Sequence, residues 1–353
     1  MLNRIKKILT RKKRAGAIRQ EFDRVFSGLS QNPLDPALHK KLADLYGEKN
    51  QWVPAISEYR TAISLGDKSG TVFFSLARAY FALGCFSAAV SAARKALSLP
   101  GGTAPEGENS GEEAQRIIAA AEQQPDSFLL HHHEHNQYYR LRSIADHLEG
   151  LFKGREFSLL DVGGGLGFLS LFLPEADYVL AEPGVNRIDG AKLPFADEAF
   201  DVVVSCHVLE HIPPRERPQF LDALCAKSKR YVILLNPFAG KDSSFEERMN
   251  LIIEKTGYSW AQEHLECSLP TLEEVTRFAE DRNYKYKIVP NGNLSLTTAY
   301  VFLNYFAGLA GKREDLVEIN RYFNEKLFDK LDSAEMPTAY LVELDKGAAH
   351  PPS

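Results

Sequence analysis

A run of glycines directly after a short apolar stretch constrains this chain more than any other feature. Residues Phe157 to Gly167 read FSLLDVGGGLG, and the large apolar side chains before the glycines are typical of a buried parallel strand. The apolar residues Phe168 to Leu173 then predict the start of a helix. A strand that passes through glycines into a helix brings bare backbone N–H groups close to a ligand.

The spacing of these glycines differs from the dinucleotide-binding fingerprint. That fingerprint requires G-x-G-x-x-G, whereas the order here is D-x-G-x-G-x-G, with Asp161 at the end of the strand. Tyr178 to Ala181 reads as a second strand, and it is followed by Glu182, 21 residues after Asp161 (182 − 161). A third segment, LPFADEAFDVVVSCHVLEHIPP, spans Leu193 to Pro214.

These three segments resemble, in order and spacing, the class I S-adenosylmethionine (SAM)-dependent methyltransferases. The resemblance implies an α/β Rossmann-like, doubly wound sheet, with SAM as the cofactor and S-adenosylhomocysteine as its product. A carboxylate after the second strand can accept hydrogen bonds from both ribose hydroxyls. The residues that the resemblance assigns to SAM are Asp161, Gly163, Gly164, Gly165, Gly167, Glu182 and Asp189.

The connection after the second strand is shorter than the resemblance leads one to expect. Asp189 stands in the position that caps the adenine amino group in related enzymes. It lies only seven positions after Glu182 (189 − 182). The helix that normally follows the second strand is therefore predicted to be short or missing.

Composition and charge exclude several other classes of protein. Of the 353 residues 44% are hydrophobic, which is ordinary for a globular protein, and the length allows two or three domains. A net charge of −5 gives no reason to expect nucleic-acid binding. The four cysteines form no C-x-x-C pair and read as reduced thiols. No apolar run approaches the roughly 18 residues of a membrane span. These features predict a cytoplasmic location.

The first residues carry an unusual concentration of positive charge. Lysines and arginines dominate residues 1–14, and no acid appears before Glu21. Leucines and isoleucines in the same stretch would share one face of a helix. The segment 1–16 is therefore predicted to be a basic amphipathic segment, suited to an anionic surface such as the inner face of the membrane. A solvated terminus fits the same pattern.

Residues 17–125 repeat with a fixed period. Leu42-Ala43, Tyr46 and Ala62 return as Leu76-Ala77, Tyr80 and Ala96, each at the same interval along the chain (76 − 42 = 80 − 46 = 96 − 62). This interval equals the period of the tetratricopeptide repeat (TPR), about 34 residues, and the small and aromatic positions also resemble that repeat. The resemblance implies an all-helical domain whose groove holds a partner protein. A structural spacer or a dimer contact is the alternative.

The remaining chain is predicted to form the methyltransferase domain, residues 126–346, and a flexible tail, 347–353. A helix from His131 to Phe152 opens the domain. His131 and His135 stand one helical turn apart, but no carboxylate or cysteine has a matching spacing, so no metal site is predicted. Alternating strands and helices further on predict a mostly parallel sheet.

Two histidines are the candidate catalytic residues. Methyl transfer from SAM is an in-line displacement, so a base is needed only when the acceptor is a hydroxyl or a protonated amine. His207 follows the fourth expected strand of the family pattern, and His211 lies one turn later. Both have a suitable intrinsic pKa. A hydrogen bond that only ties down the loop is the alternative reading of His211.

The acceptor is predicted only from a resemblance over a longer stretch of the chain. The stretch from Glu182 to Val275 resembles bacterial methyltransferases associated with surface-glycan synthesis, which implies a hydroxyl of a glycan, glycolipid or other small acceptor. Two alternatives stay open. One is a protein methyltransferase guided by the repeats, and the other is a non-catalytic scaffold that keeps a SAM-binding fold.

Overall fold

The computed structural model describes residues 2–99, 110–126, 128–240, 244–330 and 335–347, with side chains from residue 16 onward except those of residues 110, 132 and 329. The chain divides into two compact units. Unit one contains residues 1–126, Gly165–Leu171 and Tyr178–Asp189, and unit two contains the rest. Two segments of the predicted methyltransferase domain therefore belong to the same compact unit as the N-terminal helices.

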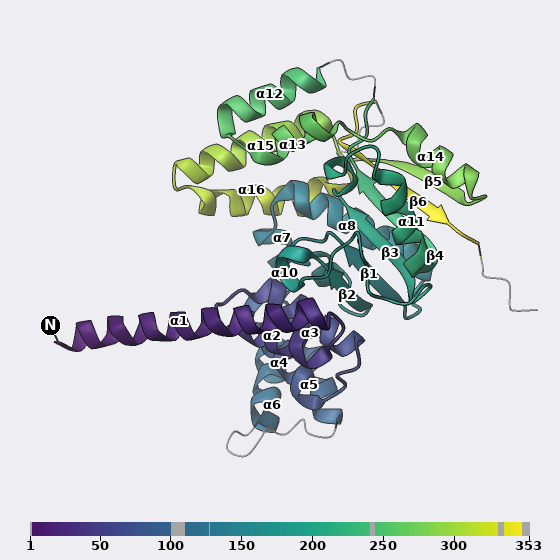
Figure 1. The fold of residues 1–353 in the computed structure, drawn as a ribbon. Coiled ribbons are helices and arrows are strands. Elements are labelled where there is room, and N and C mark those ends of the chain that lie inside the picture. Colours follow the sequence, from purple (N-terminus) through teal and green to yellow (C-terminus); the bar gives the residue numbers. More distant parts are fainter. Residues whose placement is uncertain (1, 100–109, 127, 241–243, 331–334, 348–353) are drawn as a thin grey trace, which may run out of the picture. The chain divides into compact units, whose positions relative to one another are not determined.

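One six-stranded sheet organises the second half of the chain (Figure 1), with the strand order β2-β1-β3-β4-β6-β5. The segments predicted as strands all form strands. In β1 to β4, side chains on both faces are buried, as is typical of strands inside a sheet covered on both sides. Val202–Val204 and Val232–Leu235, for example, are fully buried. The bounds are β1 (Ser158–Val162), β2 (Asp177–Ala181), β3 (Phe200–Cys206), β4 (Ser228–Asn236), β5 (Lys285–Asn291) and β6 (Ala339–Asp345).

The sheet is mostly parallel, as predicted, and one strand, β6, makes it mixed. Strand β3 pairs in parallel with β1 and with β4, so the carboxyl ends of these three strands share one edge. Strand β6 pairs antiparallel with both β4 and β5. Two successive antiparallel pairings give β5 the same direction as β4, so among β1, β3, β4, β5 and β6 only β6 runs opposite to the others.

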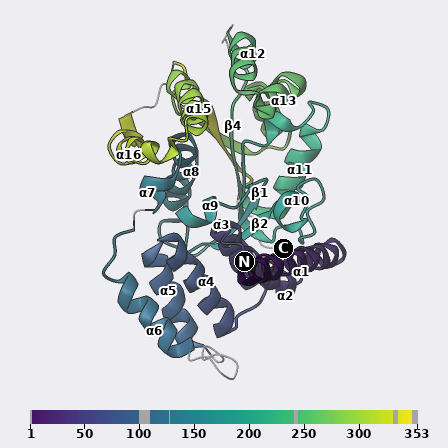
Figure 2. The same cartoon turned by 90° about the vertical axis from the view of Figure 1, so that its left-hand side faces the viewer.

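Helices cover both faces of this sheet in unit two. Figure 2 shows α8 and α11 on opposite sides of the strands, and α12, α13 and α15 side by side. The helices are α7 (Phe128–His132), α8 (His135–Phe152), α11 (Arg217–Lys227), α12 (Phe245–Thr256), α13 (Ser259–Cys267), α14 (Leu272–Asp281), α15 (Leu294–Leu309) and α16 (Leu316–Tyr322), with 3-10 turns at Leu209–His211, Arg313–Asp315 and Phe328–Lys330 and a π turn at Phe323–Leu327.

The helix predicted from His131 to Phe152 is interrupted. The Glu134 side chain accepts hydrogen bonds from the backbone N–H groups of Asn136 and Gln137, both at 3.1 Å, and so starts α8 as its N-cap. His135 is buried, and its Nδ1 lies 2.9 Å from Asn324 Oδ1. The side chain of His135 is thus held within the protein core.

Unit one begins with a series of helices, as predicted. They are α1 (Leu2–Gln31), α2 (Pro36–Glu48), α3 (Trp52–Ser64), α4 (Gly70–Leu83), α5 (Phe86–Ser98) and α6 (Ser110–Ala121). Helix α4 starts as many residues after the start of α2 as α5 does after the start of α3 (70 − 36 = 86 − 52). Helix α1 continues without a break through residue 16, where the sequence suggests a boundary. The side chains of residues 1–15 and all of residues 348–353 lie outside the described part, so the basic face and most of the tail do too. No helix in the described ranges is long and apolar enough to cross a membrane.

Helix α3 is buried on every side, including its polar residues. Ten consecutive residues, Val53–Ala62, are buried, which marks a helix enclosed by other elements. Ser57 Oγ donates to the carbonyl oxygens of Leu166 and Gly167, each at 3.2 Å. Thr61 Oγ1 accepts from Leu180 N at 3.2 Å. Helix α3 therefore holds both later segments of the chain that belong to unit one.

A buried charged pair completes this packing. Glu58 is fully buried; its Oε2 lies 2.6 Å from His39 Nδ1, and its Oε1 accepts from Asn186 Nδ2 at 2.9 Å. His39 Nε2 faces the carbonyl oxygen of Pro33 at 2.8 Å. Both ring nitrogens of His39 thus face acceptors, which favours the doubly protonated, charged imidazole.

This pair predicts that stability falls as the pH rises. Burial alone would lower the pKa of His39, but the Glu58 carboxylate outweighs burial and the pKa is raised above 6.5. The stabilisation by the pair is complete below about pH 6.5, the pKa expected in the unfolded chain, and is lost as the pH rises through the folded pKa. Urea unfolding between pH 6 and 9 should show this decline in wild type. If the free energy of unfolding changed with pH in the same way in wild type and in His39→Gln, a charged His39 paired with Glu58 would be contradicted.

Candidate functional site

The glycine loop begins where β1 ends, and its first glycines are required by close packing. Gly163 has a φ of 74°, and a Cβ there would lie 2.4 Å from Val208 Cγ2. A Cβ on Gly164 would lie 2.2 Å from Asp161 Oδ2, and Asp161 itself is buried. Any larger residue at either position would collide with these neighbours. The structure thus places Gly163 against Val208, the residue that follows His207.

The later glycines serve two different purposes. Gly167, with a φ of 83°, leaves room for α3, because a Cβ there would lie 2.0 Å from Ser57 Oγ. A Cβ on Gly165, with a φ of 56°, would meet open space. Gly165 N donates to Glu182 Oε2 at 3.2 Å. The backbone at Gly165 is therefore bare, accessible and next to the predicted ribose-binding carboxylate.

Glu182 stands at the carboxyl end of β2 and also starts the next helix. Its Oε1 accepts from Gly184 N at 3.1 Å, which makes it the N-cap of α10 (Pro183–Asn186). This four-residue helix is the short element expected after the second strand. Asp189 follows it at an exposed position.

The two candidate catalytic histidines line one cavity in unit two, of about 1230 Å³. His207 leaves β3 with a left-handed φ of 57°, and its backbone N–H donates to Leu235 O at 2.8 Å. His211 Nδ1 lies 2.8 Å from Glu263 Oε2. The structure therefore brings the two histidines to the same wall, after the parallel strand β3.

A buried carboxylate that the sequence did not single out lies behind these histidines. Glu210 is fully buried, and its Oε2 accepts a hydrogen bond from Asn236 Nδ2. Its Oε1 lies 3.0 Å from His207 Nδ1 and 3.9 Å from Nε2 of His264, a residue of α13. Burial, together with the charge of Arg140, lowers the pKa of His207, so its imidazole is neutral at pH 7 and can accept a proton.

The comparisons with known proteins show which family of domains this part of the chain matches. Residues 133–287 match the family model described as "Methyltransferase domain". These residues form a methyltransferase domain. The match begins just before α8 and ends within β5, so it contains the glycine loop, Glu182 and the histidine wall.

Relatives with curated names match a shorter stretch of the chain. A protein of Mycobacterium marinum described as an uncharacterized methyltransferase is 32% identical over 112 residues, which is 24% of this chain and 43% of that protein. A Mycobacterium tuberculosis protein of the same description is 30% identical over 112 residues, again 43% of its length. The chain thus spans less than half the length of the curated relatives it matches.

Solved structures of methyltransferases are also similar to the chain. The plantazolicin methyltransferase in complex with S-adenosylhomocysteine is 14% identical, with 61% of this chain and 85% of that one covered and a TM-score of 0.39. A SAM-dependent methyltransferase from Archaeoglobus fulgidus is 16% identical, with 58% and 92% covered and a TM-score of 0.35.

The residues present in the methyltransferase domain fit SAM. The open space above Gly165 leaves its backbone accessible, and the partly exposed Glu182 carboxylate presents acceptor oxygens for ribose hydroxyls. Bound SAM supplies a methyl group activated by its sulfonium. The sequence pattern missed Glu210 and His264, although the dipeptides Glu210-His211 and Glu263-His264 are a repeated signal that could have drawn attention to them.

One buried arginine connects the loop that carries His207 and His211 to α13 and α14. Arg217 is 3% exposed. Its guanidinium donates to Ile212 O and Cys267 O, both at 3.0 Å, to Ser268 O, and to Glu274 Oε2 at 3.2 Å. It therefore connects the loop that carries His211 to the end of the helix that carries His264.

Arg217→Met is expected to lower the free energy of unfolding by about 2–4 kcal/mol, because three partly buried carbonyls and the Glu274 carboxylate lose their donor. Chemical denaturation measures this loss. The matched control is Arg215→Met, since the Arg215 side chain is 85% exposed and should tolerate the change. Equal stability of the two variants would contradict the bridging role of Arg217.

Proposed function

We propose that this protein is a SAM-dependent methyltransferase that methylates a hydroxyl group of a glycan or glycolipid. The observation that carries the proposal is the position of His207. This imidazole lines the 1230 Å³ cavity and directly precedes Val208, against which the glycine loop packs at Gly163. His207 thus supplies a base to the cavity wall, and its neighbour Val208 contacts the glycine loop proposed to bind SAM.

The proposed reaction forms one bond and breaks one. The acceptor oxygen attacks the methyl carbon of SAM, and the carbon–sulfur bond breaks with its electrons moving to sulfur, which gives S-adenosylhomocysteine. His207 takes the proton that the hydroxyl loses. The carboxylate of Glu210, 3.0 Å from His207 Nδ1, stabilises the imidazolium that forms.

The cavity lining suits a sugar. Trp260 and Tyr340 supply aromatic rings on which the apolar face of a sugar ring can pack. Arg140, Arg248 and Glu134 supply charged groups that hydrogen-bond sugar hydroxyls. The volume exceeds that of typical small-ligand pockets, roughly 300–1,000 Å³, and therefore leaves room for an acceptor larger than one sugar.

The test is an acceptor screen with the full chain. The protein is incubated with SAM carrying a labelled methyl group and with separated glycan, glycolipid and protein fractions. Label in a carbohydrate fraction is expected, and His207→Ala should slow its transfer by about 10²-fold or more. Label only in polypeptide would favour a protein methyltransferase, and no label despite SAM binding would favour a scaffold.

We also propose that the helical hairpins of unit one are TPR-like and support the cofactor-binding half. The equal spacing of the helix starts supports the first part. The bonds from α3 to Leu166, Gly167 and Leu180 support the second. A partner protein in the groove of the hairpins is a further part of this proposal. Cross-linking of the purified full chain in cell extract tests it, with antibody fragments against α2–α5 as competitor; cross-links that the fragments do not reduce would contradict it.

For residues 1–14 we propose peripheral contact with an anionic membrane surface. The positive charge of this segment supports the proposal. Co-sedimentation with vesicles containing phosphatidylglycerol should fall when residues 1–14 are removed. Equal sedimentation of the shortened chain would contradict it.

A further inference from the structure

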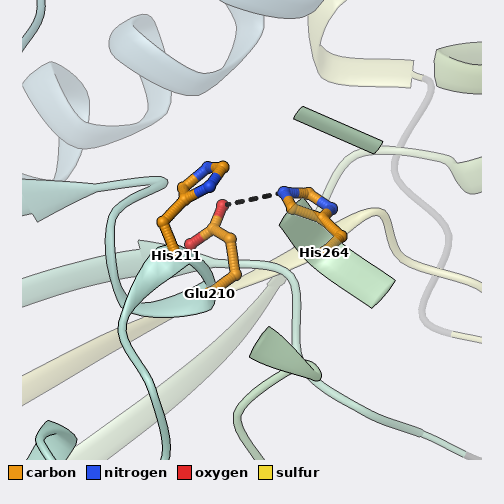
Figure 3. Close-up of side chains that lie close together, drawn as sticks. All are labelled: Glu210, His211 and His264. Carbon is orange, nitrogen blue, oxygen red and sulfur yellow. Dashed lines mark ion pairs between the residues drawn. The ribbon is translucent and has the colours of Figure 1, made fainter. Parts of the chain in front are cut away.

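Glu210, His211 and His264 form a compact cluster at the wall of the cavity. One potential ligand atom from each residue lies within 4.8 Å of the others. The cluster joins the 3-10 turn Leu209–His211 to α13, and Figure 3 shows the Glu210 carboxylate between the two imidazole rings. All three residues belong to unit two.

One oxygen of the Glu210 carboxylate accepts no well-aligned hydrogen bond from the described residues. Asn236 holds Oε2. Oε1 is buried and, among the residues that the structure describes, has no hydrogen-bond partner of acceptable geometry, even though His207 and His264 lie nearby. A buried carboxylate oxygen whose partners are poorly aligned is costly, and coordination of a metal ion is one way in which proteins offset that cost.

We propose that Glu210, His211 and His264 bind a divalent transition-metal ion. Two imidazole nitrogens and one carboxylate oxygen are donors that suit Zn²⁺, Mn²⁺, Fe²⁺ or Co²⁺, whereas Ca²⁺ and Mg²⁺ prefer oxygen donors throughout. Ligand atoms about 2.1 Å from one ion lie roughly 3–4 Å apart, so the cluster closes around an ion with side-chain movements of about 1 Å.

The surroundings are already arranged to orient these ligands. Asn236 fixes the second oxygen of Glu210, and Glu263 lies 2.8 Å from His211 Nδ1. Arg217 holds Ile212 on one side and the end of α13 on the other. Partners of this kind set the orientation of metal ligands in proteins.

The ion would have open coordination positions toward the acceptor. His211 and His264 both line the cavity, so an ion bound by three protein ligands faces its interior. An acceptor hydroxyl bound there would lose its proton more easily, because a divalent ion lowers the pKa of a bound oxygen. This last step rests on the proposed methyl transfer to a hydroxyl, whereas the metal site itself does not.

The test measures metal binding without SAM or acceptor, so that its failure is distinct from failure of the proposed function. Tag-free full-length protein, freed of metal with EDTA, is titrated with Co²⁺ while the visible absorption bands of the ion are recorded. One equivalent should bind. Glu210→Gln and His264→Gln should each weaken binding by about 100-fold or more, since removal of mere supporting partners already costs 10–100-fold.

The control is His147→Gln, which removes a histidine paired with Glu343 outside the cluster and should bind Co²⁺ like wild type. Circular dichroism checks that each variant is folded, and two variants in different elements guard against misfolding of one. Absence of stoichiometric binding by wild type at 1 mM Co²⁺, or unchanged binding by both cluster variants, would overturn the proposal.

Discussion

Glu58→Ala is expected to lower the free energy of unfolding by about 3–5 kcal/mol, the usual cost of removing one partner of a buried charged pair. The fully buried Glu58 joins His39 of α2 to Asn186 of α10. Its loss leaves His39 and Asn186 without their shared acceptor. Because α10 directly follows Glu182, SAM affinity should fall as well. Urea denaturation and calorimetric titration with SAM measure the two effects.

Two further variants serve as controls for Glu58→Ala. Glu48→Ala removes an exposed glutamate at the end of α2 and should leave both quantities unchanged. Glu58→Gln keeps an oxygen for Asn186 but loses the charge, so it should fall between wild type and Glu58→Ala. If Glu58→Ala destabilises the protein no more than Glu48→Ala does, the His39–Glu58–Asn186 contacts do not stabilise the segment around Glu182.

Glu182→Ala is expected to weaken SAM binding by about 1.5–3 kcal/mol, the range for a lost hydrogen bond to a charged group. That corresponds to about 10- to 150-fold in the dissociation constant. Glu182 also holds Gly165 N at 3.2 Å and Gly184 N at 3.1 Å, so the variant loosens the loop that faces the ligand.

The control for this variant is Glu175→Ala, an exposed glutamate just before β2. Its dissociation constant for SAM should equal that of wild type. Glu182→Gln keeps one acceptor oxygen and should have an intermediate affinity. A Glu182→Ala protein that binds SAM like Glu175→Ala would remove Glu182 from the site.

Local patterns were enough to predict the elements that position the loop. The apolar run before Gly163 and the run before Glu182 are buried on both faces, so their sequences alone indicate strands. The directions of β5 and β6 were not predictable in this way. Their alternation of side chains is the same in a parallel and an antiparallel pair, and only the pairing of β6 with β4 and with β5 decides between them.

Long-range contacts also explain what the sequence did not reveal about the site. His264 lies far from Glu210 along the chain, and only the folding of α13 brings it within 3.9 Å of that carboxylate. Ser57, Glu58 and Thr61 are polar residues of a helix, which usually indicate a solvated face. They are buried because the segments around Gly167 and Leu180 cover them.

The most direct measurement of the central claim is a calorimetric titration of the wild-type full chain with S-adenosylhomocysteine. A SAM-dependent methyltransferase should bind it at one site per chain, with a dissociation constant of about 1–100 μM, within the range in which enzymes commonly bind their substrates. Folded protein that gives no binding heat at millimolar S-adenosylhomocysteine would contradict the account.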